Sequence, residues 1–324
     1  MTVDEFEEAL RDKKQTLSLT SRTFVDVQQE FCKELERLKT RGVVGASYYR
    51  DHFYGLARLA DKLKKSPEDA GPLLRDIDKA MLDDFYDNEL DLGYSPTTAR
   101  NYFRFLSALY NWPIKQGFVT KNPTHDVRLV NHKPEVSILK PGELQKLLNH
   151  ACWYTKCWIL FGAFAGVRSS EIGWLRWEDI RLPENQFYIP GRKNVGAERW
   201  CKLTPPLRAF LEEALATGPR KGLIMNGMHG GNTTFRRLMA SLYERAGMKI
   251  PANALRHSFG SHHLQAHQAS YLTASEMGHV SPRTTYQHYR KAVTTKQAAE
   301  YWNVRTSIKC FSKAAAGEDM QKAA

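Results

Sequence analysis

Three short segments in the second half of the chain carry side chains that suit the binding of a phosphate group. In residues 165–172, Arg168 follows a glycine that breaks an apolar run, and Glu171 comes three residues later. An arginine presents a planar fork of donors to a phosphate, and a nearby carboxylate can hold that fork in place. A buried Arg–Glu pair with a purely structural role is at least as common, so this segment alone does not identify a site.

The other two segments add histidine and tyrosine. Arg256 and His257 are adjacent, and His279 is followed within ten residues by Tyr286 and Tyr289. A lone histidine is more often a satisfied structural residue than a catalyst, and a lone tyrosine on a helix usually belongs to the core or the surface. The joint occurrence of these residue types, in this order, favours one shared site.

The sequence here resembles the tyrosine recombinase, or phage integrase, family over roughly residues 22–305. The matching motifs are, in chain order, residues 166–172 (first arginine box), Lys193 (hairpin lysine), residues 253–257 (second box, usually His-x-x-Arg-His), residues 277–279 (Leu-Gly-His) and Tyr289 (nucleophile). Residues 95–123 are similar to the end of the family's helical core-binding domain. One motif is weakly specific, whereas five in the correct order are a strong signal.

The resemblance implies that the protein cleaves and rejoins DNA by covalent catalysis. Tyr289 would attack the phosphorus and form a 3′-phosphotyrosine, which splits one difficult step into two. Arg168 and Arg256 would stabilise charge on the non-bridging oxygens. Lys193 would protonate the leaving 5′ oxygen, and His279 would donate a hydrogen bond or assist proton transfer. Because the covalent intermediate conserves the energy of the broken bond, we expect no cofactor and no metal.

Three further residues are expected to support this chemistry: Asn253, Glu171 and His257. Asn253 occupies a position where the family commonly has histidine. An asparagine can donate a hydrogen bond to a phosphate oxygen, but it cannot carry a proton at neutral pH. The substitution therefore puts a base role at this position in doubt.

The identity of the nucleophile has an alternative. The spacing from His279 to Tyr289 is ten residues, one more than is usual in the family, and Tyr286 lies seven residues after His279. We favour Tyr289 because residues 288–290 resemble the family pattern better.

The hairpin lysine also has rivals, Arg192 and Lys202. Arg192 is a poor general acid because its pKa lies above ~12. Lys202 falls in the second predicted strand rather than in the turn, so we favour Lys193.

The charge of the chain points to a polyanionic partner. The net charge is +12. Residues 1–130 carry 20 Lys and Arg against 21 Asp and Glu, whereas residues 131–324 carry 27 against 14. Such a basic balance favours nucleic acid. Arg100 and Arg104 share one face of a predicted helix, and with Lys115 they are candidates for DNA phosphate contacts. A solvated basic surface explains them equally well.

Hydrophobic periodicity predicts a mainly α protein with a small β-hairpin or sheet. Helices are expected at residues 24–38, 49–63, 73–86, from 95 onward and at 153–165, and strands at 187–189 and 200–203. The expected architecture has two domains, as in tyrosine recombinases. Its parts are a flexible N-terminal tail (1–20), a helical, SAM-like core-binding domain that binds DNA (21–124), a linker (125–138), a mixed α+β catalytic domain (139–305) and a C-terminal tail (306–324).

The expected partner is double-stranded DNA. Residues 291–305 resemble a segment that packs against a neighbouring subunit in the family, so we expect a homotetramer on DNA; the alternative is a terminal helix packed on its own domain. Five scattered cysteines without a Cys-x2-Cys pair argue against zinc and favour a cytoplasmic, nucleoid-associated protein. No apolar run is long enough to span a membrane, so no membrane association is expected.

Integration or excision of a mobile element is favoured over multimer resolution, because residues 277–279, at the Leu-Gly-His motif, depart from the pattern of Xer-type resolvases. Two alternatives stay open. One is a type IB topoisomerase-like enzyme, against which the helical N-terminal domain and the short chain argue. The other is a catalytically inactive DNA-binding protein of the same fold, against which the complete set of motif residues argues.

Overall fold

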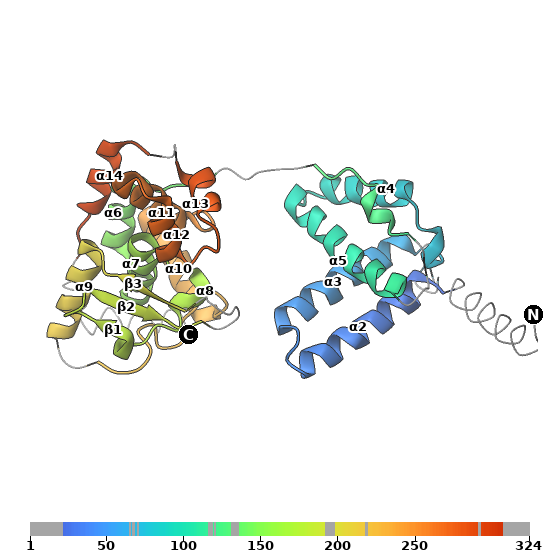
Figure 1. Ribbon diagram of the computed structural model, residues 1–324, viewed down its shortest axis with the longest axis horizontal. Coiled ribbons are helices and arrows are strands. Elements are labelled where there is room, and N and C mark those ends of the chain that lie inside the picture. Colours follow the sequence, from blue (N-terminus) through green and yellow to red (C-terminus); the bar gives the residue numbers. More distant parts are fainter. Residues whose placement is uncertain are drawn as a thin grey trace, which may run out of the picture. The chain divides into compact units, whose positions relative to one another are not determined.

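The computed structural model describes residues 22–64, 66, 69, 71–115, 119, 121–130, 136–191, 198–217, 220–290 and 293–306. The chain divides into two compact units, Met1–Pro134 and Glu135–Ala324. In the described residues of the first unit the regular structure is helical, whereas the second unit combines helices with a small sheet (Figure 1). The predicted fold class, mainly α with a small sheet, is confirmed.

The described part of the first unit contains helices α2 (Phe24–Thr40), α3 (Ala46–Leu63), α4 (Lys79–Asp91) and α5 (Pro96–Lys115), with a 3-10 turn η2 (Pro123–His125) after them. Helix α2 begins where the sequence predicts it, because Thr23 and Asp26 form a capping box. The apolar faces of the helices share one core. Val127 and Leu129, which fall in the predicted linker, also pack against this core.

The helix predicted for residues 73–86 is wrong in its first half. Leu74–Asp76 forms a 3-10 turn, η1, and Ile77 is extended. The side chain of Asp78 then accepts a hydrogen bond from the backbone of Met81, 2.9 Å away, and starts α4. An aspartate side chain competes for backbone N–H groups, so it favours a helix cap over a helix interior.

The second unit is built around the apolar helix α7 (Trp153–Ala165), which lies in the middle of the unit in Figure 1. Helix α7 is buried on most sides because its sequence is apolar all round. The other described helices are α6 (Pro141–His150), α8 (Ser169–Ile172), α9 (Pro205–Ala216), α10 (Thr233–Ala246), α11 (Ala254–His267), α12 (Ser270–Met277), α13 (Pro282–Tyr289) and α14 (Thr295–Trp302).

The sheet is antiparallel, in the order β1 (Ile180–Arg181), β2 (Gln186–Ile189) and β3 (Arg199–Lys202). The two predicted strands correspond to β2 and β3, while β1, which follows the 3-10 turn η3 (Trp177–Asp179), was not predicted. Phe187 and Cys201 are directly paired and buried on one face. Because side chains alternate between the two faces of a strand, one face of the sheet is apolar and packs against the core.

Helix α14 packs on its own unit in the single chain. The hydroxyl of Tyr301 donates to the backbone oxygen of Ala163 in α7, and the ring of Tyr301 stacks on His262 with centroids 3.8 Å apart. This is the packing named above as the alternative to docking on a neighbouring subunit. None of the described helices is both long enough and apolar enough to cross a membrane.

Candidate active site

The turn between α7 and α8 positions the first arginine. Gly166 ends α7 in the left-handed conformation, φ +62°, and the chain then turns into α8 at Arg168. A side chain at residue 166 would be strained at this φ and would also collide with the ring of Phe259. The glycine is therefore required to bring Arg168 out of the apolar helix at this point.

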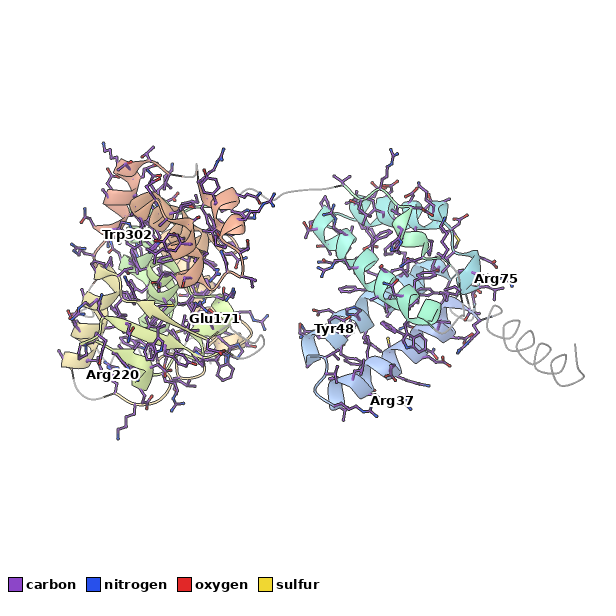
Figure 2. All side chains as sticks on the ribbon, in the orientation of Figure 1. Arg37, Tyr48, Arg75, Glu171, Arg220 and Trp302 are labelled. Carbon is purple, nitrogen blue, oxygen red and sulfur yellow. The ribbon has the colours of Figure 1, made fainter. Side chains whose placement is uncertain are left out.

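Arg168 is held by two fixed acceptors. Its Nη1 donates to Glu171 Oε1 at 2.7 Å, and its Nη2 donates to the backbone oxygen of Gly278 at 2.5 Å. Glu171 Oε2 also accepts from the backbone N–H of Arg168 at 3.0 Å. Burial opposes the charge of Glu171, but hydrogen bonds from Arg199 and Arg168 outweigh it and lower the pKa of this carboxyl. Glu171, a residue of α8, is labelled in Figure 2.

Arg256 projects from the first turn of α11 and is also held by two acceptors, both of them backbone oxygens. It donates to the backbone oxygens of Gly166 and, at 2.7 Å, Met277. Burial, together with the positive charges of Arg168 and Arg199, lowers the pKa of Arg256 to about 10. The guanidinium therefore stays charged at neutral pH, but it lies in an environment that favours a bound anion.

Tyr289 ends α13 with a side chain that is only 5% exposed. Its hydroxyl is hydrogen-bonded to His257 Nδ1 at 2.9 Å. Burial raises the pKa of Tyr289, while Arg256 opposes the shift. Burial and the charge of Arg256 lower the pKa of His257. A protonated phenol next to a neutral imidazole is an arrangement in which the histidine can accept the phenolic proton.

His279 follows the left-handed Gly278 at the end of α12. Its Nδ1 is hydrogen-bonded to the hydroxyl of buried Thr285 at 2.7 Å, which leaves Nε2 as the ring nitrogen for a bound group. Burial and then the charges of Arg256, Arg168 and Arg199 lower the pKa of His279 to about 4. The ring is therefore neutral at pH 7.

One open cavity of about 590 Å³ brings most of the predicted residues together. It is lined by Arg168, Ser169, Ser170, Asn253, Arg256, His257, His279, His288 and Tyr289. Asn253 is exposed and has φ +58°, a conformation that asparagine tolerates better than most residues. Within the described ranges, no group of three His, Cys, Asp or Glu side chains is placed to hold a metal ion.

The rival tyrosine and lysine lie elsewhere. Tyr286 is 49% exposed, is not among the cavity-lining residues, and stacks with Arg290 at 5.3 Å. Lys202 has an exposed side chain on β3, outside the cavity lining. Lys193 and Arg192 lie outside the described residues, so their placement stays a prediction.

The predicted DNA contacts on α5 differ from one another. Arg100 donates to the backbone oxygen of Val130 at 2.8 Å, so it ties the chain that follows η2 to α5. Arg104 is exposed. The side chain of Lys115, the last residue of α5, is outside the described residues. Their role as DNA contacts stays a prediction.

Sequence reasoning missed Arg199, which lies behind the cavity on β3. Its Nη2 donates to Glu171 Oε2 at 2.9 Å and its Nε donates to the backbone oxygen of Glu276 at 3.0 Å. The side chain of Arg199 is 9% exposed. A buried-facing arginine in a strand that otherwise alternates apolar and polar residues was the only signal in the sequence.

Gly278 offers a test of how tightly this region is built. Its φ is +64°, and a Cβ there would lie 2.9 Å from Nη1 of Arg199. Gly247 ends α10 with φ +58°, but a Cβ there would meet nothing closer than 3.8 Å. Alanine at either position costs roughly 1–2 kcal/mol for the left-handed backbone, and Gly278→Ala carries the collision in addition.

We therefore expect Gly278→Ala to lower the free energy of unfolding, measured in urea, by more than Gly247→Ala does. Equal losses in the two variants would contradict the close packing of Gly278 on Arg199.

Comparison with known proteins identifies the family that the sequence motifs resemble. The model of the phage integrase family matches residues 137–296. Tyrosine recombinase XerC of Neisseria gonorrhoeae is 27% identical over 265 residues, which cover 74% of this chain and 82% of that protein. Prophage integrase IntR of Escherichia coli K12 is 22% identical over 237 residues, which cover 61% of this chain and 58% of that protein.

Solved structures share the fold. A lambda integrase dimer bound to a COC′ core site superposes with a TM-score of 0.67 at 15% identity, covering 87% of this chain and 81% of that one. The Tn1549 transposon integrase in complex with transposon right end DNA gives 0.63 at 17% identity, covering 86% and 97%. The part of the second unit that contains the site, residues 137–296, therefore belongs to the phage integrase family, and the chain is similar over most of its length to curated tyrosine recombinases.

Proposed function

We propose that this chain is a site-specific recombinase that cuts and rejoins double-stranded DNA through a 3′-phosphotyrosine at Tyr289. The observation that carries the proposal is the single cavity in which Tyr289 meets two anchored arginines, Arg168 and Arg256, and the neutral His279. These residues come from separate segments of the chain that are joined by hydrogen bonds. Arg168 donates to the backbone oxygen of Gly278, next to His279, and Arg256 donates to the backbone oxygens of Gly166 and Met277.

The proposed reaction is an exchange of one phosphate ester for another. The DNA phosphate binds between Arg168 and Arg256, whose remaining N–H groups stabilise its charged oxygens. The hydroxyl oxygen of Tyr289 attacks the phosphorus and passes its proton to His257. The bond from phosphorus to the 5′ oxygen breaks, and Lys193 protonates that oxygen. Attack by a 5′ hydroxyl of another strand reverses the steps and releases the tyrosine.

His279 and Asn253 complete the proposed phosphate site. A neutral His279 can donate one hydrogen bond from Nε2 when Thr285 donates to Nδ1, and this fixes the tautomer. Asn253 lines the cavity and is exposed, so its amide can donate to a phosphate oxygen. We assign the proton-accepting role to His257 because it contacts the tyrosine directly.

We further propose that the protein acts as a homotetramer at the nucleoid, for integration or excision of a mobile element. Three relatives support this: a prophage integrase, a transposon integrase, and a lambda integrase tetramer bound to a Holliday junction. In the first unit, the proposed phosphate contacts are Arg104, which is exposed, and Lys115 at the end of α5. Arg100 would support them by holding the backbone of Val130 against α5.

A nicked suicide substrate tests the proposal. It carries the cognate site, identified beforehand by sequencing DNA that the protein binds or integrates. We expect a denaturation-resistant protein–DNA adduct, and strand exchange between two site-bearing duplexes. If the protein forms the adduct and relaxes supercoiled DNA but does not exchange strands, a topoisomerase-like enzyme would be favoured. Tight, salt-sensitive binding without an adduct would overturn the proposal in favour of an inactive DNA-binding protein.

A further inference from the structure

Arg199 connects the two segments that hold the phosphate-binding arginines. On one side, both of its terminal nitrogens donate to Glu171, at 2.9 and 3.3 Å. Glu171 is the residue that holds Arg168. On the other side, Nε of Arg199 donates to the backbone oxygen of Glu276, at 3.0 Å. One guanidinium thus bridges α8 and the end of α12.

The end of α12 supplies the acceptors that fix the arginines. The backbone oxygen of Met277 accepts from Arg256, and that of Gly278 accepts from Arg168. These carbonyls directly follow Glu276, which Arg199 holds. Gly278 packs closely against the guanidinium of Arg199, since a Cβ on Gly278 would lie 3.0 Å from Cζ of Arg199. A shift of Arg199 would therefore move the acceptors of both arginines together.

Two further residues of β3 strengthen this connection. The carboxylate of Glu276 accepts from the backbone N–H of Lys202 at 3.0 Å, and its backbone oxygen accepts from the thiol of Cys201 at 3.4 Å. Arg199, Cys201 and Lys202 thus all attach the strand to Glu276 of α12. These hydrogen bonds are largely buried, so they can fix the distance between β3 and the end of α12.

Arg199 also contributes charge at the cavity. Its positive charge is among the causes that lower the pKa of His279 and of Arg256. It does not line the cavity, so it acts on a bound phosphate only through these neighbours.

We propose that Arg199 is a positioning residue for phosphoryl transfer, which sets the separation of Arg168 and Arg256 by bridging Glu171 to the backbone of Glu276. The proposal rests on the function proposed above. A lysine keeps the charge but cannot donate to the carboxylate and the carbonyl in one plane. A methionine has a similar length but removes both the charge and the donors.

The test compares Arg199→Lys with Arg208→Lys. Arg208 is a matched control, because it too bridges a carboxylate, Glu212 at 2.8 Å, and a backbone oxygen, Leu182 at 2.9 Å, away from the cavity. We expect Arg199→Lys to slow single-turnover cleavage about 10- to 100-fold, with DNA affinity as in Arg208→Lys, at an assay temperature at which both variants are folded. Arg208→Lys should cleave at the wild-type rate.

A second measurement separates charge from geometry and does not require cleavage. The pKa of His279, followed by NMR, should rise in Arg199→Met and stay unchanged in Arg199→Lys. Wild-type cleavage by Arg199→Lys would overturn the proposal, and so would a cleavage loss matched in Arg208→Lys or explained by a lower Tm. An unchanged His279 pKa in Arg199→Met would overturn the charge contribution. Absence of an adduct from the wild-type protein would instead count against the proposed function.

Discussion

Tyr289→Phe is expected to abolish the covalent protein–DNA adduct while leaving DNA affinity unchanged. The substitution removes the attacking oxygen and retains the ring. That ring is buried against α11, where a Cβ on Gly260 would lie 2.7 Å from it. The variant loses the hydrogen bond to His257, worth about 1 kcal/mol, so it should fold. Adduct yield on the suicide substrate and band-shift affinity measure the two effects separately.

Tyr286→Phe is the matched control, because it makes the same change three residues away on the same helix. Tyr286 is exposed and lies outside the cavity, so its variant should form the adduct at the wild-type rate. Adduct formation lost in Tyr286→Phe and kept in Tyr289→Phe would move the nucleophile by one turn of α13.

Arg256→Lys is expected to slow cleavage about 100- to 1,000-fold. The guanidinium of Arg256 uses two of its N–H groups to hold the backbone oxygens of Gly166 and Met277, and the others are left for the phosphate. A lysine ammonium has three donors on a flexible stem, so it cannot keep both anchors and present a planar fork. The charge is retained, and the loss therefore reports geometry. Single-turnover cleavage at saturating protein is the measurement.

Arg220→Lys serves as its control. Arg220 is also a well-packed arginine, which lies over the rings of Trp153 and Trp177 and donates to the backbone oxygen of Ala214, remote from the cavity lining; it is labelled in Figure 2. This variant should lose stability but not the rate of cleavage. Equal rate losses in Arg256→Lys and Arg220→Lys would show that the first variant is merely misfolded.

Elements with strong local signals could be predicted from the sequence. Thr23 and Asp26 form a capping box that marks the start of α2. The length and apolar composition of residues 153–165 predict the buried helix α7. Asp78 marks the error, because its side chain caps α4 instead of lying inside a longer helix, and Ile77 before it is extended and buried. The sequence contained this local capping signal, but the apolar periodicity was given more weight.

The site could be predicted as a set of residues but not as a network. The motif order gave Arg168, Arg256 and His279 their expected roles, and all three line the cavity. Arg199 was missed because its partner Glu171 lies 28 residues away in the chain, in α8. The contact of His257 with Tyr289, 32 residues apart, depends on how α13 packs on α11. No spacing rule within one helix or hairpin encodes either contact.

Peptide mapping of the trapped adduct shows directly whether Tyr289 becomes covalently joined to DNA. Trypsin cleaves after Arg283 and Arg290, so one peptide, residues 284–290, contains both tyrosines, and fragment ions must locate the attached nucleotide. We expect a 3′-phosphonucleotide on Tyr289, with Tyr286 unmodified. A nucleotide on Tyr286, or on any residue outside this peptide, would contradict it.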